Sequence, residues 1–414
     1  GDSPWFRGKS PFVLQCQGEC MTDSNQSPNP QIDPSKEVRS LIQRAGPITF
    51  SQYMQACLYS SQGGFYSSRE NRINTHFGTS PTSHPVFGTL VARQLEQMWQ
   101  ILERPSVFQV IEVGSGDGAL ARSIVDAAQL MDSGIADALY YVATDYEPWW
   151  PESLDNILGW DGRNQGSRPH GREISWGIDR VKAEGVTPFK NIVGCILCNE
   201  LLDNFPVHRF VIDEGIIKEV YVTDTGEDFE EILDTPSTPE IEQRLASLGL
   251  SLPEGYRGEV NLGLGPWVDQ IIESLDRGFV LTIDYGELAK DLYSSQHVGG
   301  TLICYNRHTS NVNPYQAIGS QDITSLVDFT SLMKVGEERG LSTVGYTLQR
   351  YFLANLGFPS FLDSLDAQGL SYARTELSRM AMATLVDPEE YGDFKVLVQS
   401  KGIGKNAQLL GLEK

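Results

Sequence analysis

The stretch Val107–Val125, "VFQVIEVGSGDGALARSIV", runs from an apolar segment through three glycines into a helical pattern. Gly114, Gly116 and Gly118 allow the backbone to turn tightly and to approach a ligand closely. A glycine-rich turn between a strand and a helix is typical of nucleotide-binding sites. Because the spacing also satisfies the dinucleotide pattern G-x-G-x-x-G/A, the turn alone leaves a nicotinamide or flavin cofactor open.

Two acidic residues flank this turn and bear on the choice of cofactor. Glu112 lies directly before the glycines, where a carboxylate repels a pyrophosphate but suits a cationic, amine-bearing ligand, directly or through water. This favours S-adenosylmethionine. Asp145, at the end of the next apolar run, is placed to accept hydrogen bonds from ribose hydroxyls, which both cofactors require.

A second polar cluster follows a later apolar run, in "CNELLDNFPVHRF". Asn199, Glu200 and Asp203 come together there, and carboxylates are costly to bury without a partner, so we expect them to face a ligand. If that ligand is arginine, paired carboxylates suit its permanently charged guanidinium. Glu200 and Asp203 are therefore catalytic candidates. The alternative is that they cap the following helix.

His208, in the same segment, is a weaker catalytic candidate. A histidine can relay a proton near neutral pH. A lone histidine beside Pro206 and Val207 is also a common structural hydrogen-bonding group, and the sequence leaves both roles open.

The rest of the chain alternates strand-like and helix-like segments. Four short apolar runs, "FQVIEVG", "LYYVATD", "NIVGCILCNELL" and "GFVLTIDYG", are separated by helical patterns. Runs of this kind predict a doubly wound, mostly parallel sheet covered on both faces, an α/β fold with its ligand at the carboxyl ends of the strands. We expect helices before this sheet, and a short helix in "PEIEQRLASLG" closed by Gly249.

Composition narrows the partners. The formal charge of −22, from 54 acidic and 32 basic residues, argues against binding nucleic acid and favours a cationic partner, although an acidic surface also simply aids solubility. No apolar run approaches the roughly 18 residues that span a bilayer, so we expect no membrane span and a cytoplasmic protein. Cys195 and Cys198 form a C-x-x-C inside a buried strand pattern, and we expect no metal there.

Several segments taken in order resemble the MidA family of class I S-adenosylmethionine-dependent methyltransferases, relatives of the mitochondrial arginine methyltransferase that assists complex I assembly. The resemblance extends over about residues 37–402. The segments that carry it are "GPITFSQYMQACLYSSQGGFY", "FGTSPTSHPVFGTLVARQLEQMW", "EVGSGDGALA", "CNELLDNFPVHRF", "LTIDYGE", "GGTLICYNRH" and "GSQDITSLVDFTSL".

This resemblance implies a cofactor site and a protein substrate. The cofactor-binding residues implied by it, together with those indicated by the patterns above, are Thr79, Ser80, Pro81, Glu112, Gly114, Gly116, Gly118, Asp145, Tyr146 and Asn199. Thr79–Pro81 match a segment that closes over the cofactor in such proteins. The motifs at Asp284–Gly286, Asp322–Thr324 and Val327–Phe329 also match. For Asp284–Gly286, which can be a turn after a strand, and for Asp328 and Phe329, which can anchor a helix start, structural and functional roles are equally open. One departure is Thr75–Phe77, where the family has Gly-Asp-Phe; the loss of the acidic residue beside the lid bears on substrate choice or on lid closure.

The expected function is therefore methyl transfer to an arginine of a protein partner, such as a subunit of a complex I-like dehydrogenase, in the mitochondrial matrix if the chain is eukaryotic. An NAD(P)-dependent oxidoreductase and a non-catalytic assembly factor that binds S-adenosylmethionine are the alternatives. The expected organisation is a disordered or added leader (1–36), a helical region with the lid (37–104), a first core part (105–223), an inserted cap (224–265), a second core part (266–402) and a tail (403–414).

Overall fold

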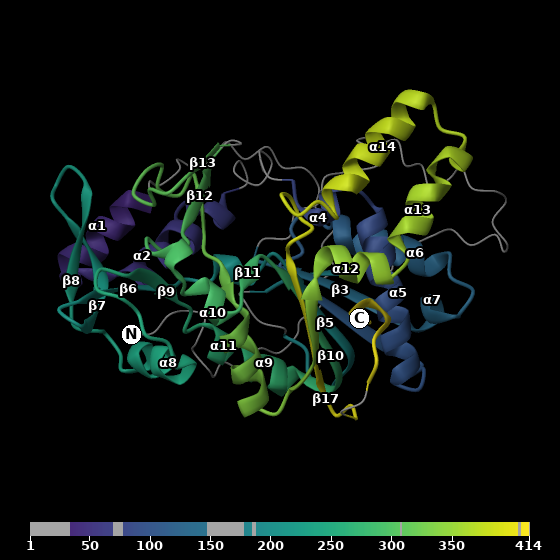
Figure 1. Ribbon diagram of the computed structural model, residues 1–414, viewed down its shortest axis with the longest axis horizontal. Coiled ribbons are helices and arrows are strands. Elements are labelled where there is room, and N and C mark those ends of the chain that lie inside the picture. Colours follow the sequence, from purple (N-terminus) through teal and green to yellow (C-terminus); the bar gives the residue numbers. More distant parts are fainter. Residues whose placement is uncertain are drawn as a thin grey trace.

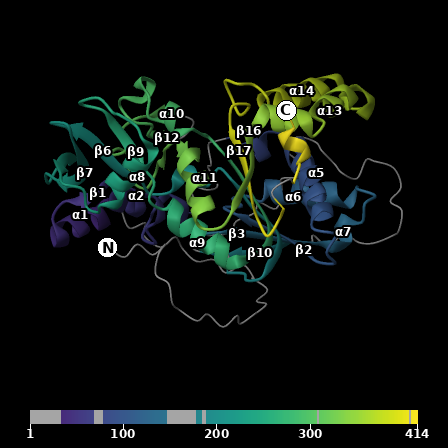
Figure 2. The ribbon, with the colours of Figure 1, turned by 60° about the horizontal axis from the view of Figure 1, so that its bottom comes forward.

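The computed structural model describes residues 34–68, 78–146, 178–183, 188–306, 309–404 and 407–413 (Figure 1). Most of the expected leader and the Thr75–Phe77 departure lie outside these ranges. The described chain forms two lobes side by side, one built on a large central sheet and the other on smaller antiparallel sheets (Figures 1 and 2).

The central sheet has seven strands in the order β16-β17-β10-β5-β2-β3-β4. Strands β10, β5, β2, β3 and β4 run parallel, β17 is antiparallel to β10, and β16 is antiparallel to β17. This confirms the expected α/β fold. The strands are β2 (Phe108–Val113), β3 (Leu139–Asp145), β4 (Ile178–Lys182), β5 (Ile192–Asn199), β10 (Leu275–Asp284), β16 (Ser342–Leu348) and β17 (Lys395–Lys401).

Both faces of this sheet are buried because successive side chains of a strand point to opposite faces. In β5, Cys195 and Leu197 join one core cluster, whereas Ile196 and Cys198 join another. The first face is covered by α5 (Val86–Ile101), α6 (Ala119–Gln129) and α12 (Gln349–Asn355), and the second by α9 (Leu264–Ser274) and α11 (Phe329–Glu338). Cys195 and Cys198 therefore project to opposite faces and do not converge.

The second lobe gathers chain segments that are far apart in sequence. Its five-stranded sheet contains β1 (Ile48–Thr49), β6 (His208–Asp213), β7 (Ile216–Asp224), β8 (Phe229–Asp234) and β9 (Arg257–Val260). Its three-stranded sheet contains β12 (Ile303–Asn306), β13 (Thr309–Asn311) and β14 (Asp322–Thr324). Helices α1 (Pro34–Ala45) and α2 (Phe50–Tyr59) pack on this lobe through its hydrophobic core.

The inserted part is larger than expected from the sequence. The chain leaves the central sheet at β6 rather than near residue 224. β6 pairs with β7 and β9, and β7 pairs with β1, β6 and β8, so neither strand joins the central sheet. A second departure carries β12, β13 and β14, within a segment expected to be core. The helix expected in this region is present as α8 (Glu240–Leu248), and Gly249 ends it in the left-handed conformation, with φ of 66°.

The remaining α-helices and strands are short connections and a helical pair beside the central sheet. They are α4 (Ser80–Ser83), α7 (Ile135–Ala138), β11 (Gly286–Glu287), α10 (Ala289–Leu292), β15 (Val327–Asp328), α13 (Phe358–Ser364) and α14 (Tyr372–Thr384). Within the described ranges, none of the helices combines the length and apolarity that a membrane span needs.

Candidate active site

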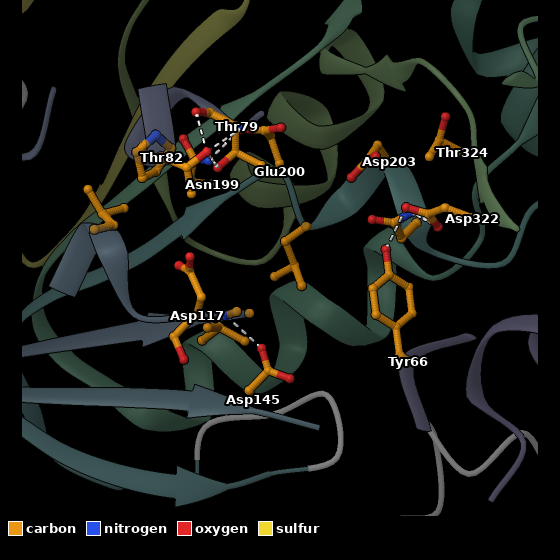
Figure 3. Close-up of a pocket in the computed structure, with 18 of the residues that line it drawn as sticks. Tyr66, Thr79, Thr82, Asp117, Asp145, Asn199, Glu200, Asp203, Asp322 and Thr324 are labelled. Carbon is orange, nitrogen blue, oxygen red and sulfur yellow. Dashed lines mark hydrogen bonds between the residues drawn. The ribbon is translucent and has the colours of Figure 1, made fainter. Parts of the chain in front are cut away.

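A cavity of about 640 Å³ lies at the carboxyl ends of the central strands and extends toward the second lobe (Figure 3). At the end of the cavity formed by the glycine turn, here called the nucleotide-type end, Asp117 and Asp145 line the wall. Its other end carries Asp203 and Asp322, and Glu200 lies on the side of the cavity next to Asn199 and the lid (Figure 3).

The glycine turn connects β2 to α6 with the geometry expected of it. Gly114, Gly116 and Gly118 have φ of 76°, 51° and 75°, a conformation that side chains disfavour. A Cβ on Gly114 would lie 2.9 Å from Cδ1 of Leu201. Gly114 and Gly116 line the cavity, whereas Gly118 is the N-cap residue of α6 and donates its N–H to the Ser115 carbonyl at 2.9 Å.

Asp145 closes the turn from the end of β3. Its Oδ2 accepts a hydrogen bond from the Gly116 N–H at 2.8 Å, so the carboxylate fixes the turn as well as facing the cavity. The next residue, Tyr146, donates its hydroxyl to the Tyr59 carbonyl at 3.1 Å and also lines the cavity. This residue therefore connects the nucleotide-type end to the second lobe.

Glu112 is almost fully buried, with 3% of its surface exposed, at the base of the cavity. Burial raises its pKa to about 8, although the Tyr141 hydroxyl donates to it at 2.7 Å. Asp117 is a second acid at the turn that the sequence analysis did not select; its Oδ1 accepts the Ala119 N–H at 3.0 Å. Its position between Gly116 and Gly118 is the only feature of the sequence that could have indicated it. Two carboxylates here disfavour a pyrophosphate.

Glu200 follows β5 and adopts a left-handed backbone, with φ of 51°. Its Oε1 accepts hydrogen bonds from Asn199 Nδ2 at 2.8 Å and from the Ser80 N–H at 3.4 Å. Burial raises its pKa to about 8, and the nearby Asp284 carboxylate acts in the same direction. Neither hydrogen bond uses Oε2, so this oxygen remains available to a ligand.

The lid residues contribute to the cavity in different ways. Thr79 and Pro81 line it, whereas the Ser80 side chain is fully buried and bonds to Gln349 Oε1 at 3.2 Å. The Ser80 N–H reaches Glu200, so α4 connects the lid to a catalytic candidate. Thr79 and Thr82 form a capping box that starts α4.

Asp203 lies in the short turn after β5 and is 3% exposed. The Tyr285 hydroxyl donates to its Oδ2, whereas its buried Oδ1 has no hydrogen-bond partner among the described residues. Burial raises its pKa well above the usual range. Capping of the turn falls to Asp284, which accepts the Leu201 and Leu202 N–H groups at 3.1 and 2.8 Å.

His208 does not reach the site, and the suggested proton relay is corrected on this ground. It begins β6, outside the cavity lining, and its Nδ1 lies 2.6 Å from Oε1 of the buried Glu219. This contact matches the alternative, a structural hydrogen bond inside the second lobe. The sequence could not separate the two roles because Glu219 lies on the neighbouring strand β7.

The cavity lining is strongly acidic. No lysine, arginine or histidine is present among the described residues that line it. The acidic lining residues are Glu112, Asp117, Asp145, Glu200, Asp203, Asp322, Glu389 and Glu390. Carboxylates gathered in this way without cationic side chains suit a cationic ligand.

Comparison with known proteins agrees with this geometry. The family model "Putative S-adenosyl-L-methionine-dependent methyltransferase" matches residues 90–347, more than half of the chain. The chain belongs to this methyltransferase family. The resemblance seen in the sequence is thereby confirmed, S-adenosylmethionine is the cofactor of this methyltransferase, and the oxidoreductase alternative is not supported.

Named relatives match over most of their length. The Drosophila melanogaster "Protein arginine methyltransferase NDUFAF7 homolog, mitochondrial" is 26% identical over 390 residues, covering 89% of this chain and 85% of the relative. The Homo sapiens "Protein arginine methyltransferase NDUFAF7, mitochondrial" is 24% identical over 408 residues, covering 94% and 87%.

Two solved structures are similar to this methyltransferase over almost its whole length. The Burkholderia thailandensis protein, crystallised with S-adenosyl-homocysteine, has a TM-score of 0.76 and 26% identity, covering 94% of this chain and 97% of that one. The same organism's protein in its native form gives a TM-score of 0.76 and 27% identity, with coverages of 94% and 98%.

The residues of this methyltransferase fit its cofactor. Ser115 Oγ and Asn199 Oδ1 are buried polar atoms at the cavity without a hydrogen-bond partner in the described ranges. The glycine turn leaves its backbone open at Gly116, where a Cβ would meet nothing within 4 Å. Glu112 lines the same end of the cavity, where a carboxylate fits a cationic ligand.

Proposed function

We propose that this methyltransferase transfers a methyl group to a guanidinium nitrogen of an arginine in a protein partner. The observation that carries the proposal is the cavity, which combines the glycine turn with carboxylates and contains no cationic side chain in its described lining. The names of the relatives, protein arginine methyltransferases, support the same acceptor.

The cofactor supplies an activated methyl group when it is bound. We propose that Glu112, Gly114, Gly116, Asp145 and Asn199 hold it, since all of them line the same end of the cavity. Gly118 and the buried Ser80 support this end through the turn and the lid. Positioning of the acceptor in line with the methyl group then contributes much of the rate.

Glu200 and Asp203 are proposed to orient the acceptor guanidinium. Each has one carboxylate oxygen without a hydrogen bond in the described structure, Glu200 Oε2 and Asp203 Oδ1. Methylation of a guanidinium nitrogen releases one proton, and the charge of the product is unchanged. Glu200, with its pKa raised to about 8, is suited to accept that proton at Oε2 near neutral pH.

The partner and compartment follow from the resemblance to relatives. A subunit of a complex I-like dehydrogenase is the proposed acceptor protein. The mitochondrial matrix is the proposed location for a eukaryotic chain, consistent with the relatives named mitochondrial, and the cytoplasm is the proposed location otherwise.

Labelled methyl transfer tests the proposal. Purified protein is incubated with methyl-tritiated S-adenosylmethionine and an extract of cells that lack this chain, and the proteins are hydrolysed to amino acids. We expect label in methylarginine. Glu200→Gln should lower the rate about 100-fold or more, because general acid–base groups contribute on that scale. Glu230→Gln, the same change at an exposed position of β8 outside the cavity, should not.

The experiment also separates catalysis from the assembly-factor alternative. A non-catalytic binder leaves no label, and its Glu200→Gln variant still rescues cells that lack the chain. Label in methyllysine, with none in methylarginine, contradicts the proposed acceptor while leaving the methyltransferase assignment intact.

A further inference from the structure

The second lobe completes the cavity through strand β14. Asp322 and Thr324 are two residues apart, so their side chains lie on the same face of the strand, and both line the cavity. Ile323 between them points the other way, into the hydrophobic core of the second lobe. Figure 3 shows Asp322 beside Asp203, at the end of the cavity away from the glycine turn.

The Asp322 carboxylate is held in place by two neighbours. The Tyr66 hydroxyl donates to Oδ2 at 2.9 Å, and Asn204 Nδ2 donates to Oδ1 at 2.9 Å. A carboxylate has about four acceptor positions, so each oxygen can still accept from a ligand. The side chain is 8% exposed, and no cationic side chain among the described cavity residues neutralises it.

Asp203 supplies a second carboxylate next to the first. Its Oδ1 is buried and without a hydrogen-bond partner in the described chain, while Tyr285 fixes the other oxygen. Burial raises the pKa of Asp203 well above its usual range, and the Asp284 and Asp322 carboxylates add to this effect through like-charge repulsion. A planar cation with several N–H groups can satisfy both at once, which a spherical cation does less well.

Tyrosine rings form the walls of this end of the cavity. Tyr59 and Tyr66 stack with ring centroids 5.4 Å apart and an interplanar angle of 22°. Tyr285 and Tyr305 line the same cavity. A guanidinium stacks on aromatic faces and is more weakly hydrated than a lysine ammonium, so aromatic walls favour it.

We propose that Asp322, paired with Asp203 and oriented by Tyr66 and Asn204, is the specificity-determining residue that selects an arginine guanidinium over a lysine ammonium. This inference rests on the proposed function and adds the acceptor pocket of the second lobe to it. Asp322 binds the acceptor guanidinium, whereas Glu200, which follows β5 of the central sheet, accepts the proton released by methylation.

Binding of short peptides tests this selection. The protein is saturated with S-adenosylhomocysteine and titrated with an acetylated Gly-Gly-Arg-Gly-Gly amide or with the same peptide containing lysine. We expect arginine-dependent binding, and a loss of at least about tenfold in Asp322→Asn, since a charge-assisted hydrogen bond is removed. Tyr66→Phe, which only frees the carboxylate, should lose less.

Controls make each outcome decisive. Glu230→Gln changes the same charge on an exposed part of the second lobe and should bind both peptides as the wild type does. S-adenosylhomocysteine affinity and the melting temperature verify that Asp322→Asn is folded, and Tyr66→Phe provides a second, milder variant.

The two proposals fail in different ways. If the wild type does not bind S-adenosylhomocysteine, the proposed function is contradicted. With that ligand bound, equal affinity of Asp322→Asn and wild type for the arginine peptide overturns the role of Asp322. Equal binding of the two peptides to the wild type, or no binding of either, overturns the selection of arginine.

Discussion

At the scale of single residues, the site contains several buried carboxyl groups whose ionisation is unfavourable in the ligand-free protein. Burial raises the pKa of Glu112 and of Glu200 to about 8 and that of Asp322 to about 6. A cation bound beside these carboxylates would lower their pKa values, because an opposite charge favours the ionised form. Ligand binding and the protonation of the cavity are therefore coupled.

Glu112 should make the ligand-free protein less stable as the pH rises. Its pKa is about 8 in the folded chain and near 4.5 in the unfolded chain, so the folded state holds the extra proton between these values. The free energy of unfolding therefore falls as the pH rises through this window and levels off above about pH 8. Thermal unfolding from pH 5 to 8 should show a smaller decrease in Glu112→Gln. An equal decrease in the free energy of unfolding in wild type and variant would contradict the raised pKa of Glu112.

Sequence patterns predicted many of these residues but not all. Glu112, Glu200 and Asp145 stand at the ends of apolar runs, so a parallel sheet brings them together. Tyr66 and Asp322 come from elements that no pattern connects to those runs. Asp322 was noticed only through the resemblance, because its role depends on the fold of the second lobe.

At the level of elements, the strands covered on both faces were predictable from the sequence, whereas the sheet to which the second-lobe strands belong was not. β5 and β10 are nearly continuous apolar runs, which mark strands that are covered on both faces. β6 and β7 contain fewer apolar residues and pair antiparallel in the second lobe. Their sequence pattern alone therefore does not show which sheet they join. The expected boundary near residue 224 was late for this reason.

The start of α11 provides a stability prediction with a functional control. Asp328 is its N-cap residue and accepts the Ser331 N–H at 3.0 Å, which settles the open question of its motif in favour of structure. Asp328→Ala should lower the free energy of unfolding by about 1 kcal/mol. Its affinity for S-adenosylhomocysteine should stay that of the wild type, because Asp328 does not line the cavity. A weakened affinity at unchanged stability would contradict this assignment.

At the scale of the whole molecule, the cavity depends on both lobes. The central sheet supplies the glycine turn, Glu200 and Tyr285, and the second lobe supplies Asp322 and Tyr66 (Figure 3). The second lobe is assembled from the N-terminal helices and two separate excursions of the chain (Figure 1). Pairings such as β1 with β7 join segments that are distant in sequence, and periodicity contains no information about them.

Calorimetric titration of the wild type with S-adenosylhomocysteine, and separately with NADH, tests whether the glycine turn and its acidic cavity bind the methyl donor. Gly116→Val adds a side chain at a cavity-lining position with φ of 51°, and Gly226→Val adds one outside the cavity lining at a position with φ of 93°. We predict micromolar binding of S-adenosylhomocysteine alone, lost in Gly116→Val and kept in Gly226→Val. Binding of NADH alone, or of neither ligand, would contradict the assignment of the glycine turn and its acidic cavity as a methyl-donor site.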